Sequence, residues 1–276
     1  MRFIILFGSP FFLLSLFVGC KESKMENEIP SWDREYYEKS EQKPYVFFGI
    51  YGSFPEKHSV TSTFYRCKGV PKGITLQKYS MEQHPDTIHT FLEGYLWEKL
   101  KESDPNWAIQ IESSPELIIL SGEPEEVENL NYLRDSVGFI TYLLDNGGVC
   151  VYDLQMARWW SVDKWKSDIF EHGKPMPWNH VLILLSDIDN HSWLHTRGMR
   201  KFGRPDLSVH NITPGQEDAY IEMIERLIAL QAYGAVVKEG QEVHMDNIPN
   251  GTKCFLRGDI DDYDFNNYHI EIEMPE

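Results

Sequence analysis

The sequence predicts an α+β protein in which a largely antiparallel sheet carries about three to four helices, packed mainly on one face. Short runs with the period-two alternation typical of strands recur along the chain. A few longer segments instead repeat their apolar residues at helical spacing. Hairpin signals such as Asn250-Gly251 lie between neighbouring strand segments and favour antiparallel pairing.

The first residues are typical of a signal peptide. Arg2 precedes an apolar run that ends at Gly19-Cys20 and turns polar at once. Residues 17–20, FVGC, resemble the lipobox of bacterial lipoproteins, with Phe17 where leucine is commoner. The resemblance implies that residues 1–19 are removed and that Cys20 carries the lipid. A secreted protein with Cys20 in a disulfide is the alternative.

Lipid on Cys20 predicts a cell-envelope protein held to a membrane without a spanning helix. In a Gram-negative cell the outer membrane is expected, because Lys21 stands where an aspartate favours inner-membrane retention in enterobacteria. The formal net charge is −17 and becomes −18 once Arg2 is removed. Such an acidic chain is not expected to bind nucleic acid.

Residues 20–43 are charged and show no apolar period, so they are predicted to form a flexible tether. Residues 44–276 are then the α+β domain, which is long enough for one core or for two subdomains with a boundary near residue 122.

The predicted helices follow from apolar spacing and end signals. Residues 86–101 place six apolar side chains on one stripe. Residues 124–144 begin with proline and are followed by Gly147-Gly148. The third helix opens at Thr213-Pro214 and ends at Gly234, and Ser161 caps a shorter one over 162–170. Strands are predicted at 45–51, 60–67, 74–79, 107–112, 116–120, 149–153, 180–186, 192–197, 207–211, 242–245, 253–257 and 268–273.

Three cysteines remain in the predicted domain. Cys150 lies in a predicted buried strand, where a free thiol behaves as a small hydrophobe. Cys67 and Cys254 are therefore the preferred disulfide pair in an oxidising compartment.

The stretch from Trp193 to His210 contains the main candidate site. Gly198 and Gly203 enclose four residues, and a helical turn there would bury Met199 and Phe202 while Arg200 and Lys201 face water. One interpretation is an anion-binding loop that uses Arg197, Arg200 and Arg204. The other is a structural hairpin in which Arg197 forms a buried ion pair with an acid such as Asp206.

TRGMRKFGRPDLSV, residues 196–209, resembles stretches of an uncharacterised bacterial family, a domain of unknown function. DFNNYHIEI near the C-terminus and GGVCVYDLQMARWWSVDKW, residues 147–165, are similar to other parts of that family. The resemblance covers most of residues 107–273 and implies a common α+β fold, without catalytic residues.

The acidic C-terminal segment fits part of a calcium-loop pattern. Asp262, Asp264, Asn266 and Glu273 occupy positions 1, 3, 5 and 12 of that pattern. Residues 269–273 alternate like a strand, so an acidic turn between two strands is the competing interpretation. No cofactor is expected unless this segment binds calcium.

Two classes of function remain open. A binding or structural module is favoured, because eight tryptophans and fourteen tyrosines offer flat contacts for a protein or glycan partner. Trp159, Trp160 and Trp165 are the densest group, although packing in the core explains them equally simply. The alternative is an envelope hydrolase or metal-dependent enzyme with Asp187, Asp189, His191 and His195 on one rim and residues 259–264 on another.

Overall fold

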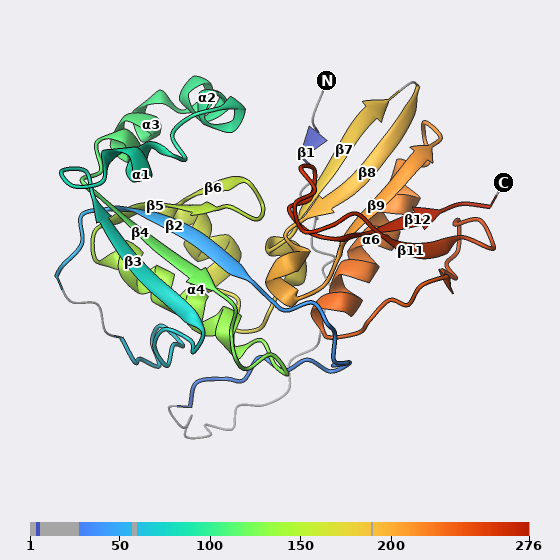
Figure 1. Ribbon diagram of the computed structural model, residues 1–276, viewed down its shortest axis with the longest axis horizontal. Helices are drawn as coiled ribbons and strands as arrows, with labels where there is room; N and C mark the ends of the chain where they lie inside the picture. Colours follow the sequence, from blue (N-terminus) through green and yellow to red (C-terminus); the bar gives the residue numbers. More distant parts are fainter. Residues whose placement is uncertain (1–3, 6–27, 57–59, 189, 276) are drawn as a thin grey trace, which may run out of the picture.

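Figure 1 shows the computed structural model, which describes residues 4–5, 28–56, 60–188 and 190–275. Two mostly antiparallel sheets stand side by side with helices around them, and the predicted α+β class is confirmed. Cys20, the predicted lipid site, lies outside the described residues.

The first sheet has the strand order β3-β4-β2-β5-β6, and every neighbouring pair is antiparallel. Its central strands bury most of their side chains, as expected for a sheet covered on both faces. Its strands are β2 (Val46–Gly52), β3 (Ile74–Ser80), β4 (Glu116–Gly122), β5 (Gly148–Asp153) and β6 (Arg158–Ser161).

The second sheet has the order β1-β7-β8-β9-β12-β11-β10. Only β9 and β12 are parallel to each other. Its strands are β1 (Ile4–Ile5), β7 (Leu182–Ile188), β8 (His191–Arg197), β9 (Asp206–Ile212), β10 (Gln241–Glu242), β11 (Lys253–Arg257) and β12 (His269–Glu273).

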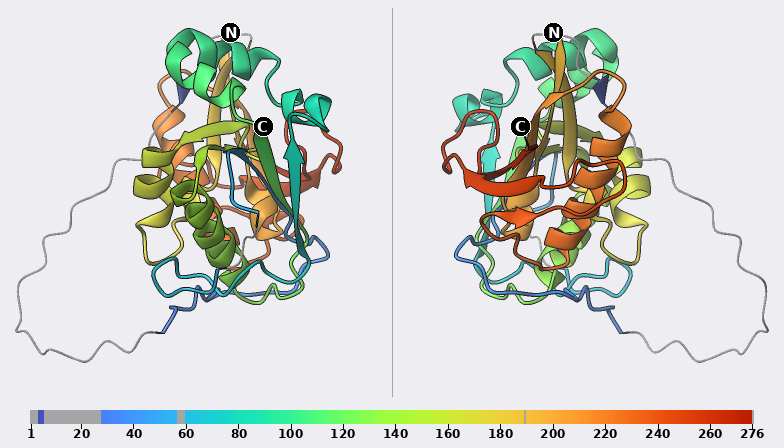
Figure 2. Two further views of the ribbon diagram at one scale, coloured as in Figure 1. Left: turned by 90° about the vertical axis from the view of Figure 1, so that its left-hand side faces the viewer. Right: turned by 90° about the vertical axis from the view of Figure 1, so that its right-hand side faces the viewer.

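The helices form two groups. Figure 2 shows α4 (Asn131–Asp145) and α6 (Glu217–Ala232) on the same side of the molecule, where they share one core with both sheets. The helices α1 (Pro85–His89), α2 (Tyr95–Ser103) and α3 (Pro105–Glu112) cover the other face of the first sheet over a second core. The short α5 (Val162–Trp165) continues into the π-helical turn η1 (Lys166–Phe170), and η2 (Pro177–Asn179) is a single 3₁₀ turn.

Several predicted elements are wrong in detail. Residues 107–112 form part of α3 instead of a strand, because Asp104 caps the helix by accepting a hydrogen bond from the Trp107 amide and Pro105 occupies its first turn. Residues 60–67 contribute only the isolated bridge Ser62–Cys67. The predicted helix 86–101 is divided at Gly94, where φ is 82°. Residue 122 ends β4 and does not separate the sheets, since β5 and β6 follow it in the same sheet.

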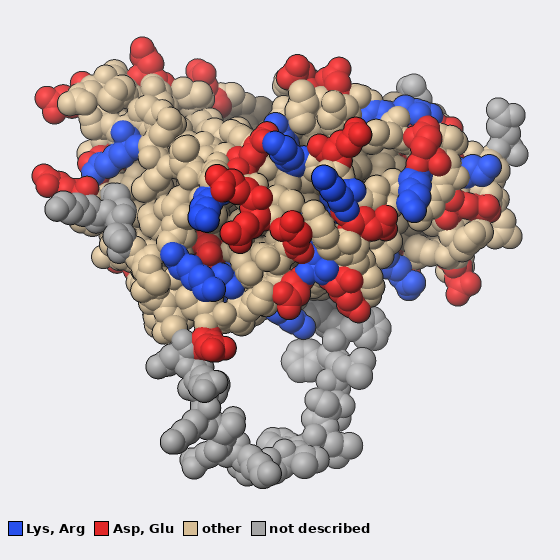
Figure 3. Space-filling model, turned by 60° about the horizontal axis from the view of Figure 1, so that its bottom comes forward, with Lys and Arg blue, Asp and Glu red and all other residues tan. Residues whose placement is uncertain are grey.

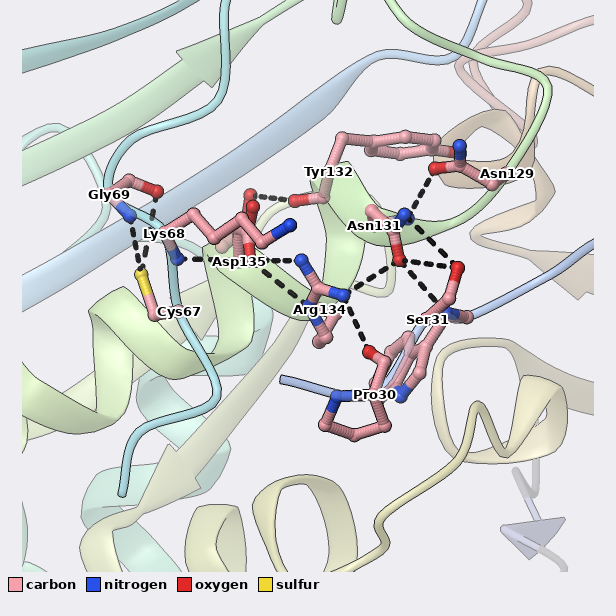
Figure 4. Close-up of polar contacts among 12 residues, drawn as sticks. Pro30, Ser31, Cys67, Lys68, Gly69, Asn129, Asn131, Tyr132, Arg134 and Asp135 are labelled. Atoms are coloured by element: carbon pink, nitrogen blue, oxygen red, sulfur yellow. Dashed lines mark hydrogen bonds and ion pairs between the residues drawn. The ribbon is translucent and has the colours of Figure 1, made fainter. Parts of the chain in front are cut away.

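The second half of the predicted tether packs against both sheets. We call residues 28–45 the strap. Trp32 and Arg34 within it are buried, and the Arg34 guanidinium donates to carbonyls that come from three different segments. Figure 4 shows Arg134 of α4 donating to the Pro30 carbonyl and to Asp135. One buried indole and these guanidinium contacts therefore order a segment whose composition alone predicts flexibility.

Candidate functional site

The glycine-bracketed connection lies between β8 and β9 and contains a 3₁₀ turn, η3 (Met199–Phe202). Met199 and Phe202 are fully buried, as predicted. Lys201 is also fully buried, contrary to the prediction that it faces water. Its ammonium forms an ion pair with Asp153 at the end of β5, so the turn joins the two sheets.

Arg204 is buried and holds the strap in place. Its guanidinium donates to the carbonyls of Gly203, Ala235, Glu38 and Gly234. Burial lowers the pKa of Arg204 to about 10, so the group remains cationic at neutral pH. Most of its donors are already used, and the group contributes charge rather than free hydrogen bonds.

Arg197 is the last residue of β8. It is half-buried on the outer face of the second sheet and makes no ion pair with any described residue, so the buried pair expected with Asp206 is not formed. Asp206 accepts hydrogen bonds from Thr196, Met199 and Asn267 instead. The Arg197 Nε atom is buried without a hydrogen-bond partner among the described residues.

Arg200 faces a cavity of about 870 Å³ between the strap, the second sheet and the end of α6. One of its guanidinium nitrogens donates to the Asn266 carbonyl at 3.3 Å, and the guanidinium stacks 4.7 Å from the Tyr45 ring centroid. These contacts fix the side chain and leave other donors unused. Of the three predicted anion-binding arginines, the cavity brings together Arg200 and Arg204 and leaves out Arg197.

The walls of the cavity combine charge with apolar surface. Its basic residues are Lys39, Lys43, Arg200 and Arg204, and its acidic residues are Glu41 and Glu123. Its apolar wall is made by Val236, Val237, Leu256, Ile260 and Tyr268. Lys43 and Glu123 are 3.5 Å apart but both are largely exposed, so the pair is weak.

Cations outnumber acids around this cavity although the chain carries a formal −17. Figure 3 shows the underside of the molecule, where basic and acidic side chains are interspersed without a broad surface of one sign. The excess of positive charge is therefore local. Sequence reasoning missed Lys39 and Lys43, which lie in the predicted tether; Trp32 was the one signal that this segment packs.

The four predicted calcium ligands are not gathered on one point. Asp262 accepts from the Asp264 amide, and its other oxygen lies 3.8 Å from Nδ1 of His269. Glu273 is paired with Arg257 across β11 and β12. Among the described residues no group of three or more His, Cys, Asp or Glu side chains is placed to hold a metal ion. Calcium binding stays a prediction.

The outer face of β8, β9 and β12 carries a second cluster, which we call the histidine layer: Trp193, His195, His210, Phe265 and His269. The Trp193 ring stacks on His195 at 3.9 Å, and Phe265 stacks on His269 at 4.1 Å. Burial first, and then the charges of Arg197, His210 and His269, lower the pKa of His195 to about 4. His195 is therefore neutral at physiological pH.

Of the residues in the enzyme hypothesis, His195 contacts Phe265 of the C-terminal turn, with ring centroids 5.6 Å apart. Asp189 lies outside the described residues. Ser208, His210 and Glu271 are also neighbours, but His210 Nδ1 faces both the serine hydroxyl at 3.5 Å and the carboxylate at 2.9 Å. A serine–histidine–acid triad uses the two ring nitrogens for different partners. This trio therefore does not have the geometry of a triad. His191 and His195 both lie on β8, where residues four apart are about 13 Å from each other and cannot share one metal ion.

The remaining candidates belong to the core. Cys67, Cys150 and Cys254 are free and buried, so the expected Cys67–Cys254 disulfide is absent. Cys67 packs against α4, whereas Cys254 lies in β11 of the other sheet. Trp160 and Trp165 are buried, and Trp159 packs with Trp97 on the second core.

No known protein family, curated protein or solved structure matches this chain. Function is therefore inferred from its own residues. No helix in the described part of the chain is both long enough and apolar enough to cross a membrane.

Proposed function

We propose that this chain is a lipid-anchored cell-envelope protein whose folded domain is a binding module, and that its ligand is an organic anion with an apolar portion. The lipid on Cys20 would hold the domain at a membrane surface, where a protein or glycan of the envelope is the proposed partner. The binding site is the cavity between the strap, η3 and β11.

The proposed class of ligand rests on one observation, which is that the cavity combines a local excess of cations with an apolar wall. A carboxylate or phosphate gains most from guanidinium and ammonium donors, and Arg200 is already oriented by Asn266 and Tyr45. Leu256 and Ile260 are 48% and 37% exposed, so apolar surface lies uncovered at the rim. A ligand with both features would satisfy both walls.

The anchor is supported by the sequence pattern of residues 1–20. An apolar run ends in a small residue followed by cysteine, and the next segment is polar. The proposed role is binding rather than catalysis because the cavity offers orienting charges and apolar contacts, while Ser208, His210 and Glu271 lack triad geometry.

Octanoate and octanol are suitable probes, since they share an apolar chain and differ in charge. We expect octanoate to bind to the intact protein more tightly than octanol, with an affinity that falls as salt is raised. Replacing Arg200 with Gln should weaken octanoate binding about tenfold, the worth of one charge-assisted hydrogen bond.

Arg226→Gln is the matched control, because Arg226 is exposed on α6, pairs with Glu222 and does not line the cavity. It should leave the affinity for octanoate unchanged. Equal binding of octanoate and octanol, or an Arg200→Gln variant that binds like the parent, would exclude the proposed ligand class.

A further inference from the structure

The sheets end in four edge strands, and three of them carry features that discourage further pairing. β3 contains Lys78, β6 has four residues and begins with Arg158, and β10 has two residues. The fourth edge is formed by the two-residue strand β1, which lies against β7. Figure 1 shows β1 beside β7 at the margin of the second sheet.

Strand β7 has none of the protective features of the other edges. Its sequence, LILLSDI, is seven residues long and contains no lysine, arginine or proline. Leu184 and Leu185 are half-buried at its centre, one on each face of the sheet. A long apolar strand with an open edge is a template for pairing with another chain.

The only described cover on this edge belongs to the segment that the proposed processing removes. β1 consists of Ile4 and Ile5, which pair antiparallel with Leu185 and Leu184. Cleavage before Cys20 would take both isoleucines away and leave β7 as the edge strand. This inference therefore rests on the proposed lipoprotein function.

We infer that β7 of the processed protein binds an extended apolar segment of a partner protein, which adds to the second sheet as an antiparallel strand in the place of β1. Strand β1 shows that the edge of β7 pairs with an antiparallel strand and that isoleucines can stand opposite Leu185 and Leu184. Backbone hydrogen bonds would supply affinity, and the side-chain pattern would supply selectivity.

The neighbours of the two leucines define that pattern. The Ser186 hydroxyl is buried and has no hydrogen-bond partner among the described residues, so a serine or threonine opposite it would satisfy it. Asp187 is exposed and favours a basic residue opposite. In the register of β1, the partner therefore has a basic residue opposite Asp187 and a hydroxyl-bearing residue opposite Ser186. Two apolar residues follow, opposite Leu185 and Leu184.

The peptide acetyl-KTIIVTK-amide carries this pattern, and acetyl-KTPPVTK-amide has the same charge but cannot extend the ladder. We would add each to the processed protein, reconstituted in nanodiscs after expression in a bacterium, and follow backbone hydrogen exchange. The isoleucine peptide should protect amides of Leu182–Ile188, and the proline peptide should not. Absence of protection on β7, or equal protection by both peptides, would overturn the inference. This test uses the parent protein and needs no variant.

Two variants refine the test. Leu184→Lys should lower the affinity for the isoleucine peptide at least about tenfold, because the ammonium would lose its hydration against an apolar strand. Gln77→Lys, on the exposed edge strand β3 of the other sheet, should leave the affinity unchanged. Equal effects of the two substitutions would contradict binding at β7.

The mass of the purified protein separates this inference from the function on which it rests. A chain that retains residues 1–19 would overturn both the anchor and the vacated edge. A processed, acylated chain that fails to bind the isoleucine peptide would overturn only the edge inference and leave the proposed function standing.

Discussion

Lys201 and Asp153 form an ion pair that is almost completely withdrawn from water, and it links η3 to the end of β5. The Asp153 carboxylate also accepts the backbone amides of Gln155 and Met156. Two compensated charges at this point fix one sheet relative to the other. Removing either charge should lower the free energy of unfolding strongly, because the protein interior does not solvate the charge that remains.

Lys201→Met should therefore lower the free energy of unfolding by about 3–5 kcal/mol, measured by urea denaturation. Adding Asp153→Asn should recover part of this loss, since the amide is neutral and keeps an acceptor oxygen. Lys166→Met removes a partly exposed pair with Asp145 and should cost no more than about 1 kcal/mol. A Lys201→Met loss as small as the Lys166→Met loss would show that the buried charge is not the cause.

His195 makes stability depend on pH. Its pKa is about 4 in the folded protein and about 6.5 in the unfolded chain, so the unfolded chain binds the proton first as pH falls. Stability should therefore be lost between about pH 6.5 and pH 4. Burial raises the pKa of Asp206 to about 6, which acts in the opposite direction over much of this range and is common to parent and variant.

His195→Gln removes the titration of this residue alone. The variant should lose less stability than the parent on acidification from pH 6.5 to pH 4, by up to about 3 kcal/mol. His244→Gln, at an exposed histidine, is the control and should follow the parent. Parallel pH profiles for the parent and the His195→Gln variant would refute a depressed pKa at this position.

At the scale of the element, helix α4 packs unusually closely against residues 60–69. A Cβ atom on Gly138 would lie 2.1 Å from the Tyr65 carbonyl oxygen. Glycine in a helix costs about 1 kcal/mol relative to alanine, but this overlap with backbone requires a shift of the loop or of the helix. For a Gly138→Ala substitution, the steric cost should therefore exceed the gain in helix propensity.

Gly138→Ala is accordingly expected to lower the melting temperature and to cost about 1–2 kcal/mol net. Gly173→Ala, where the nearest atom is a flexible Arg66 nitrogen at 3.6 Å, should change stability by less than about 0.5 kcal/mol. A stabilised Gly138→Ala variant would mean that the loop yields without cost.

The elements that sequence could predict are those whose local pattern and tertiary role agree. The helix α6 and the strand β12 were predicted correctly from apolar spacing and from alternation, respectively. Each of them buries the side chains on its apolar face. Residues 107–112 read as a strand because their apolar content is high, but the proline and aspartate before them start a helix. Residues 28–43 read as a tether because charge dominates their composition.

The site was harder to predict for a physical reason. Arg197, Arg200 and Arg204 are close in sequence, yet only Arg200 and Arg204 line the cavity, and Arg204 is buried in its wall. Lys39, Lys43 and Leu256 reach the cavity only through contacts between distant segments. Local sequence carries no direct signal of such convergence.

The location of the protein in the cell should depend on a single side chain. Cys20→Ala should abolish acylation and release the protein from washed membranes, because a lipid is the proposed attachment. Membrane fractionation and mass spectrometry of the parent and variant measure the two consequences separately. An unacylated Cys20→Ala protein that stays in the membrane fraction would contradict the lipid as the anchor.

A crystal structure with 8-bromooctanoate can show whether the cavity binds an organic anion. Anomalous scattering locates the bromine without reference to the protein. The expected result places the carboxylate within hydrogen-bond distance of Arg200 and the bromine against the apolar wall formed by Val236, Val237 and Leu256. Crystals grown at saturating 8-bromooctanoate that show no bromine in this cavity, or the carboxylate turned away from Arg200, would contradict organic-anion binding at this site.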